Sequence, residues 1–318
     1  MINKTEKKVI RSQKKKKKFS YNDISLLLFL LPTVIYVFLL HYMPMGGLII
    51  AFKDYNSYAG IFDSKWASNY GFKHFITFVN LPNFGQIILN TFVISVYSII
   101  VNTITPIVLA LIINEIRIKW FKKSVQTISY APYFISVVVV VGMLFSFTDL
   151  ESGIINTIIE FFGGKPTNLL ENAALFSTIY VVSGLWQGLG WWSIIYVGTL
   201  ATVDQELHEA AVMDGASRIK RILHINLPAI MPMVIIMLIL SIGNMLTVGF
   251  EKIYLMQTSG NITSSEVIST YVYRVSLMAR IPQYSYATAI GLFNSVVSLV
   301  LLISANKISS KVGETSLW

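Results

Sequence analysis

The sequence predicts an all-α protein that crosses a membrane several times. Of its 318 residues, 54% are hydrophobic and only 13% are charged, and the mean hydropathy of +0.63 is far higher than a water-soluble domain needs. A helix needs roughly 20 apolar residues to cross a bilayer core about 30 Å thick. Six stretches meet that demand: residues 24–45, 85–113, 125–147, 175–203, 229–250 and 286–308.

The amino-terminal tail, residues 1–23, carries much of the formal charge of +9. Its basic residues stand directly before the first apolar stretch: Lys4, Lys7, Lys8, Arg11 and the run 14–18. Such a cluster is typical of the cytoplasmic side of a span in contact with the lipid bilayer, so we do not expect nucleic-acid binding. We expect residues 24–45 to be the first transmembrane helix, because the run exceeds signal-peptide length and no cleavage pattern follows it.

The rest of the chain divides by charge and hydropathy. Lys53 and Asp54 predict that residues 46–84 form an interfacial turn and an outer segment. Residues 85–308 hold the other five spans, with a cytoplasmic loop at 204–228, and residues 309–318 form a tail. Positive charge gathers in alternate loops, whereas residues 148–172 are acidic apart from Lys165. The positive-inside rule therefore predicts six spans in the cell membrane, with both termini cytoplasmic.

The chain offers little for metal or covalent chemistry. It has no cysteine, which excludes disulfides, thiolate catalysis and cysteine metal sites. The four histidines have no pair at the i, i+4 spacing of a helical metal site: His41, His74, His208 and His224. We expect no catalytic residue, no metal site and no bound cofactor.

The loop at 204–228, between the fourth and fifth spans, has an organised sequence. Asp204 is suited to cap a short helix, and Gly215 to end it. Ala210 and Ala211 remove bulk from one face, which lets the helix seat closely against another protein. Charges stand at its rim: Glu206, Glu209 and Asp214. The alternative is an ordinary connecting helix that returns the chain to the membrane.

This loop resembles the signature loop of permease subunits in binding-protein-dependent ABC importers. The matching residues are Glu209, Ala210 and Ala211, then Gly215 after three residues, and further on Ile225, Leu227 and Pro228. The likeness extends to the carbohydrate permeases related to the larger maltose-transporter subunit. Segments 44–56, 267–274, 284–294 and 313–318 are similar to the branch assigned to complex oligosaccharides and polysaccharide fragments.

The resemblance implies an assembly around this chain. Its partners would be a second homologous permease subunit, two ATP-binding cassette subunits that bind ATP and Mg, and an extracellular sugar-binding protein or lipoprotein. The loop helix would dock into a cleft of the ATPase, with Glu209 in polar contact, Ala210 and Ala211 closely seated, and Gly215 permitting the turn. Asp214, Leu227 and Pro228 complete the predicted coupling residues.

A candidate solute path lies in the fourth span, where indoles surround an amide: Trp186, Gln187, Gly188, Trp191 and Trp192. Aromatic faces beside hydrogen-bonding groups suit sugar rings. The alternative is an interfacial aromatic belt with glycines that let helices pack. The family resemblance places Trp186, Gln187, Gly188 and Trp191 where the maltose-type subunit contacts its ligand. Asn244 and Glu251 are further candidates, since polar residues in spans usually face the bundle interior.

Two other classes fit less well. A secondary transporter generally places ionisable groups at mid-membrane, and the centres of the six stretches are almost free of them. The segment 163–167 has the wrong spacing for a phosphate-binding loop, so we expect this chain to be a transport subunit and not an enzyme. An ABC importer of a non-sugar solute remains the main alternative.

Overall fold

The computed structural model describes residues 21–312 and 316–317, so the basic run before Tyr21 lies outside the described residues. The helical elements, with η for π and 3-10 helices, are α2 (Tyr21–Val37), η1 (Phe38–Tyr42), α3 (Met43–Met45), η2 (Gly46–Phe52), α4 (Gly60–Asp63), α5 (Lys73–Val79), α6 (Phe84–Glu115), α7 (Lys119–Tyr130), η3 (Ala131–Phe134), α8 (Val137–Thr148), α9 (Ile154–Phe161), α10 (Phe176–Leu200), α11 (Gln205–Met213), α12 (Arg218–Arg221), η4 (Ile222–Asn226), α13 (Leu227–Gly243), α14 (Phe250–Met256), α15 (Ile262–Ser265), α16 (Ile268–Tyr273), η5 (Arg274–Met278) and α17 (Tyr284–Val312). Strands β1 (Lys53–Asn56) and β2 (Ser64–Trp66) pair antiparallel.

Within the described residues, four helices are long and apolar enough to cross a membrane: Ile24–Phe52, Phe84–Glu115, Arg218–Gly243 and Tyr284–Lys311. The bent pair Lys119–Phe134 and Val137–Thr148 makes a fifth if it is taken as one span. The predicted polytopic helical protein is thus confirmed. By length alone, the 25 residues of α10 would also suffice, but glycine, serine, glutamine and tryptophan dilute its hydropathy.

The first helix continues beyond the predicted end at residue 45. Its backbone stays helical through η1, α3 and η2, and the extended chain begins only at Lys53. Pro44 lies inside this continuous helix, directly after the π-helical turn η1, and does not end it. Residues 46–52, predicted as part of a turn, are therefore helical. The non-helical chain begins at β1, where the Lys53 ammonium donates to the carbonyl oxygens of Ile61 and Phe62.

The third predicted span is not one straight helix. Helix α7 and η3 meet α8 at a bend of 97°. Pro132 lies in the first turn of η3 and cannot donate a backbone hydrogen bond. Ser136 then caps a new helix, and its hydroxyl accepts from the amide of Val139. The fifth predicted span is also interrupted, because α13 ends at Gly243 and α14 begins only at Phe250.

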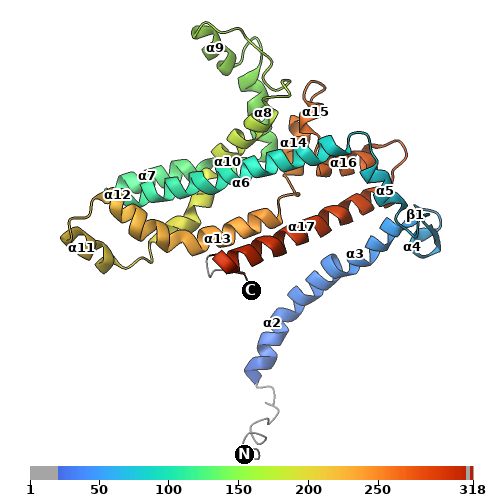
Figure 1. The fold of residues 1–318 in the computed structure, drawn as a ribbon, viewed down its shortest axis with the longest axis horizontal. Coiled ribbons are helices and arrows are strands. Elements are labelled where there is room, and N and C mark those ends of the chain that lie inside the picture. The colour runs from blue at the N-terminus through green and yellow to red at the C-terminus, as the bar shows by residue number, and fades with distance from the viewer. Residues whose placement is uncertain (1–20, 313–315, 318) are drawn as a thin grey trace, which may run out of the picture.

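The long helices form the body of the molecule (Figure 1). Helix α6 packs along α10, and α13 packs against α17. Helix α2 extends away from this body, to which the chain connects it near β1. The most apolar window of this first span has no buried residue. Helix α9 projects from the body at one extremity of the molecule, and α11 lies at another.

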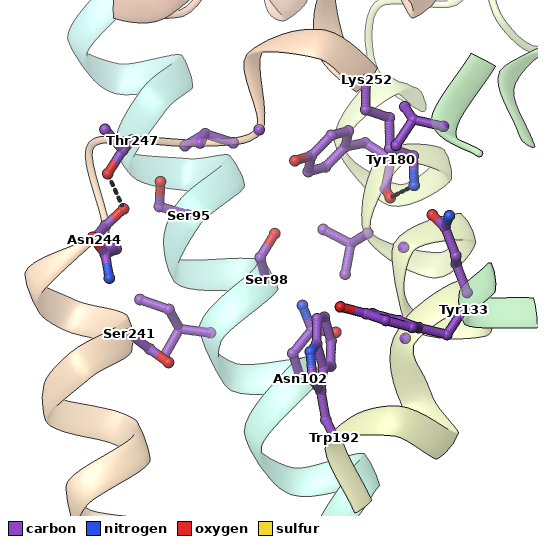
Figure 2. Close-up of a pocket in the computed structure, with 18 of the residues that line it drawn as sticks. Ser95, Ser98, Asn102, Tyr133, Tyr180, Trp192, Ser241, Asn244, Thr247 and Lys252 are labelled. Atoms are coloured by element: carbon purple, nitrogen blue, oxygen red, sulfur yellow. Dashed lines mark hydrogen bonds between the residues drawn. The ribbon is translucent and has the colours of Figure 1, made fainter. Parts of the chain in front are cut away.

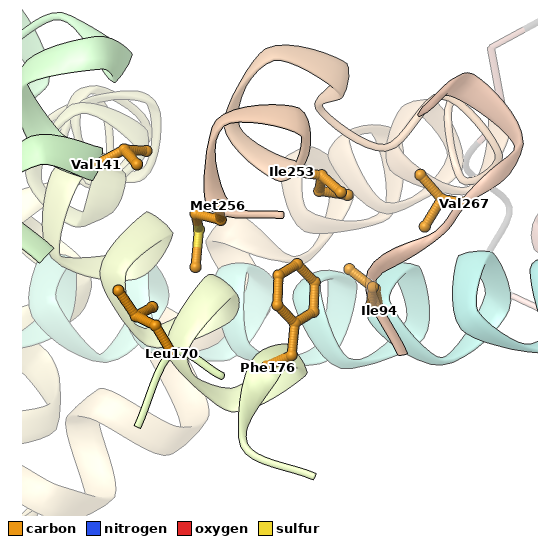
Figure 3. Packing of buried hydrophobic residues seen from close by; sticks show 7 residues of the cluster. All are labelled: Ile94, Val141, Leu170, Phe176, Ile253, Met256 and Val267. Atoms are coloured by element: carbon orange, nitrogen blue, oxygen red, sulfur yellow. The ribbon is translucent and has the colours of Figure 1, made fainter. Parts of the chain in front are cut away.

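A buried cluster fastens the segment after α13 to the bundle (Figure 3). Its members come from parts of the chain that are distant in sequence: Ile94, Val141, Leu170, Phe176, Ile253, Met256 and Val267. Phe176, at the start of α10, is fully buried between Ile94 of α6 and the α14 residues. This packing fixes α14 against α6, α8 and α10 and so positions the residues just before it.

Helix α10 approaches α7 closely at Gly190. A Cβ atom there would lie 2.1 Å from the carbonyl oxygen of Ser129 and 2.8 Å from the ring of Tyr130. Glycine is required because only its missing side chain lets the two backbones come this near. On the same helix, Gly198 has open space where a Cβ would stand.

We expect Gly190→Ala to destabilise the protein by roughly 1–3 kcal/mol, because the added methyl forces α7 and α10 apart. Gly198→Ala is the matched control, and it should be neutral or stabilising by up to about 1 kcal/mol, since alanine favours helix over glycine. Thermal unfolding of both variants in detergent measures the difference. Equal stability of the two variants would contradict the close approach at Gly190.

Candidate functional site

A cavity of about 750 Å³ opens between α6, α10, the break before α8, and the segment that follows α13 (Figure 2). Its wall combines aromatic rings with neutral polar groups. The polar and aromatic side chains that line it include Ser95, Ser98, Asn102, Tyr133, Tyr180, Gln187, Trp192, Ser241, Asn244 and Thr247. Lys252 also lines it and is the one charged residue in the wall described by the structure.

The amino-terminal half of helix α6 holds the irregular segment after α13 in place. The amide of Asn90 donates to the carbonyl oxygens of Thr263 and Glu266, at 2.9 and 3.0 Å. The hydroxyl of Thr91 accepts from the amide of Ile268 at 3.1 Å. The hydroxyl of Ser95 donates to the carbonyl oxygen of Met245.

Further along the same face of α6, the polar atoms are free. Ser98 Oγ and Asn102 Oδ1 are buried and have no hydrogen-bond partner, and both residues line the cavity. Figure 2 shows them on the side of α6 that faces Tyr133 and Tyr180. Sequence reasoning missed them, although their spacing of four was a usable signal, because residues three and four apart share a helix face.

The structure separates the residues of the indole cluster. Gln187 and Gly188 line the large cavity together with Trp192. Trp186 lines a second, apolar cavity of about 540 Å³ between α8, α9 and α10. Trp191 does not line the large cavity and stacks on Tyr133, with ring centroids 4.4 Å apart and planes 4° from parallel.

Gln187 also has a structural partner. Its side-chain nitrogen donates to the carbonyl oxygen of Ile135 at 2.7 Å. That carbonyl belongs to the break between η3 and α8, where the helix provides no partner of its own. Gln187 therefore fastens α10 to the bend that forms one wall of the cavity, and its side-chain oxygen is left for other contacts.

Of the two candidates after α13, only Asn244 lines the cavity. It ends α13, and its amide nitrogen donates to the carbonyl oxygen of Leu240 at 3.1 Å. Glu251 is exposed and is not part of the wall. Its neighbour Lys252 lines the cavity instead. The two residues are adjacent in the sequence, and no hydrophobic periodicity around them predicts which side chain faces the cavity.

The predicted coupling helix has the expected local structure. Helix α11 begins after Asp204, whose carboxylate accepts from the amide of Glu206 at 2.9 Å. It ends before Gly215, which has a φ of 74°, and the amide of Ala216 donates back to Ala211 at 2.8 Å. A positive φ favours glycine. The predicted cap and terminator are thus confirmed.

Helix α11 stands at one end of the body (Figure 1). None of its residues is buried, and none lines the cavity. Glu209, Ala210, Asp214 and Gly215 are exposed, and Ala211 is partly so. Leu227 and Pro228 lie apart from them, in the first turn of α13. Sequence reasoning overlooked the apolar side chains that α11 also presents: Leu207, Val212 and Met213, the last 87% exposed.

Residues 107–313 match the family described as the binding-protein-dependent transport system inner membrane component. The chain belongs to this family. The permease is 42% identical over 293 residues to the polygalacturonan/rhamnogalacturonan transport system permease protein YteP of Bacillus subtilis (strain 168), covering 92% of this chain and 90% of the relative. It is 40% identical over 296 residues to Protein LplB of the same strain, covering 93% and 92%.

The fold of the permease is similar to a chain in the crystal structure of a bacterial alginate ABC transporter in complex with alginate pentasaccharide-bound periplasmic protein. The TM-score is 0.85 at 36% identity, with 93% of this chain and 97% of that chain covered. The predicted resemblance to ABC importer permeases is therefore confirmed. The permease is a multi-pass transport subunit.

The free atoms in the cavity should matter for transport and not for folding. We expect Asn102→Leu in the permease to leave thermal stability unchanged or raised, because the change removes a buried acceptor that has no partner. Solute uptake by the assembled transporter should fall. Asn90→Leu is the matched control on the same helix, and it should lower stability by roughly 1–3 kcal/mol, because two carbonyl oxygens lose their donor.

Differential scanning fluorimetry and uptake into vesicles, applied to both variants, give the two measurements. A loss of stability in Asn102→Leu as large as that in Asn90→Leu would assign Asn102 a structural role instead.

Proposed function

We propose that the chain is one of two permease subunits of an ABC importer that carries an oligosaccharide into the cytoplasm. The assembly comprises a second homologous permease, two ATPase subunits that bind ATP and Mg, and an extracellular sugar-binding protein. The permease has six spans, with α10 and the bent α7–α8 pair among them and both termini cytoplasmic. The names of the relatives, which concern polygalacturonan, rhamnogalacturonan and alginate, support a carbohydrate solute.

The observation that carries this proposal is that the polar, aromatic cavity and the exposed helix α11 are two separate surfaces of the molecule. At one place a cavity combines the rings of Tyr133, Tyr180 and Trp192 with neutral hydrogen-bonding groups, which suits the C–H faces and hydroxyls of sugars. Elsewhere α11 presents charges and apolar side chains that nothing in the described chain covers. An exposed apolar helix of this kind fits a cleft of a partner protein.

In this mechanism the ATPase subunits move α11, and the helices attached to it move with it as rigid bodies. The cavity then opens in turn to the outside and to the cytoplasm. ATP must bind one state more tightly than the other, because a ligand with equal affinity for both shifts nothing. Moving the population from 1:99 to 99:1 requires about 5.5 kcal/mol of differential binding.

The coupling role of α11 is tested by Glu209→Lys and Gly215→Val in the complete importer. Reversing the exposed charge of Glu209 should oppose ATPase docking, because a basic group of the ATPase that meets Glu209 would then face a like charge. Valine at residue 215 is strained at a φ of 74°, so the end of α11 should rearrange. We expect co-purification of the ATPase and solute uptake to fall at least about tenfold.

Glu160→Lys on α9 is the matched control, because Glu160 is also an exposed helical glutamate but lies at another extremity. That variant should retain the ATPase, and all three should insert into the membrane normally. Full ATPase binding and uptake in both α11 variants would refute the coupling role.

A further inference from the structure

Lys252 differs from the other residues of the cavity wall because its side chain is charged. Its side chain comes from α14, outside the four apolar span helices, and the residue is only 8% exposed. Figure 2 shows its ammonium at one end of the cavity, beside Tyr180. The remaining residues of the wall are neutral, so this is the point in the cavity where a charge is placed.

The ammonium lacks a counter-ion within the described chain. The ammonium donates a hydrogen bond to the backbone carbonyl oxygen of Tyr180 at 3.1 Å. It also lies 5.1 Å from the centroid of the Tyr180 ring. No carboxylate of the described residues forms an ion pair with it. An ammonium has three N–H donors, so donors remain available after the bond to Tyr180.

The surrounding backbone makes room for this charge. A Cβ atom at Gly184 would lie 3.3 Å from the Lys252 ammonium, and a Cβ at Gly249 would lie 3.1 Å from the Tyr180 hydroxyl. The two glycines thus let the ammonium and the ring lie against each other at the cavity wall. Both glycines line the same cavity, so the ammonium and the Tyr180 ring are in contact at the cavity wall and not at another surface.

Burial has a cost that this position must offset. Removal from water lowers the pKa of Lys252 to about 8, and the group still carries its proton at neutral pH. Buried charges in proteins are normally paired or held by several hydrogen bonds. A bound anion would complete the missing pairing, and a carboxylate is an anion that fits beside the sugar-binding groups of the same cavity.

We infer that Lys252 binds the carboxylate of an acidic sugar, so the solute is an oligosaccharide that contains uronic acid residues. This inference rests on the proposed function and names the class of its solute. Tyr133, Trp192 and the free atoms of Ser98 and Asn102 would contact the neutral parts of the chain, whereas Lys252 would select for the acidic group. A neutral oligosaccharide would leave the ammonium unpaired, which disfavours its binding.

The test uses the complete importer in proteoliposomes, with trigalacturonate, its methyl ester and neutral maltotriose as probes. The variants are Lys252→Met, which removes the charge, and Lys252→Arg, which keeps it. Lys65→Met is the matched control, because Lys65 is an exposed lysine of β2 that does not line the cavity. ATP hydrolysis without solute is measured in each preparation as a check on assembly.

We expect uptake of trigalacturonate to fall at least about tenfold in Lys252→Met, since a hydrogen bond to a charged group is lost, and to stay within about threefold in Lys252→Arg. Lys65→Met and solute-free ATP hydrolysis should be unaffected. Any uptake of the ester or of maltotriose should change little between Lys252→Met and the parent protein.

Other results separate the two proposals. Normal uptake of trigalacturonate by Lys252→Met would overturn the role of Lys252, and so would an equal loss of acidic and neutral uptake. Uptake of maltotriose but not of trigalacturonate by the parent protein would overturn the inference and leave oligosaccharide import intact. Uptake of no oligosaccharide would reject both.

Discussion

Irregular backbone can lie within a membrane-embedded bundle only where other groups satisfy its hydrogen bonds. In this permease that requirement is met by one face of α6. Asn90, Thr91 and Ser95 bond to backbone groups between Met245 and Ile268. With these bonds made, the chain can leave helical geometry after Gly243 and bring Asn244 and Lys252 to the cavity wall.

The same requirement explains the second break in the bundle. The bend between η3 and α8 exposes the carbonyl of Ile135, and the side chain of Gln187 on α10 satisfies it. Close contact of α7 and α10 at Gly190 keeps the two helices in register for that bond. Two walls of the cavity are therefore interrupted helices, each held by polar side chains of the continuous helix beside it, α6 or α10.

Local sequence signals were sufficient to predict the features that depend on residues close together in the chain. The apolar runs predicted the long helices, and Asp204 and Gly215 predicted both ends of α11, because caps act on backbone groups a few residues away. The angle at Pro132 was not predictable in this way. A proline indicates a possible break, but the bend of 97° depends on the packing of α10 against it.

The site was predicted only in part for a related reason. Gln187, Gly188 and Asn244 were found because an amide or glycine in an apolar run is conspicuous. Ser98 was missed, since a hydroxyl in such a helix can bond to its own backbone four residues earlier, as Thr91 does. Asn102 was missed although it is an amide in an apolar run, because the helix face that it shares with Ser98 was not read from their spacing of four. Lys252 was missed because its neighbour Glu251 has the same apparent context, and only tertiary packing places one inside and the other outside.

The distribution of satisfied and free polar groups along α6 bears on what the cavity is for. Asn90, Thr91 and Ser95 have partners in the fold, whereas Ser98 and Asn102, on the same face, have buried atoms with none. Each unsatisfied atom costs stability, and Lys252 adds a nearly buried charge in the same wall. Functional sites commonly break local rules of this kind at the expense of stability. In the proposed mechanism, a solute that passes through the cavity supplies the missing partners for only part of each cycle, so the bonds that it makes are formed in transit and released again.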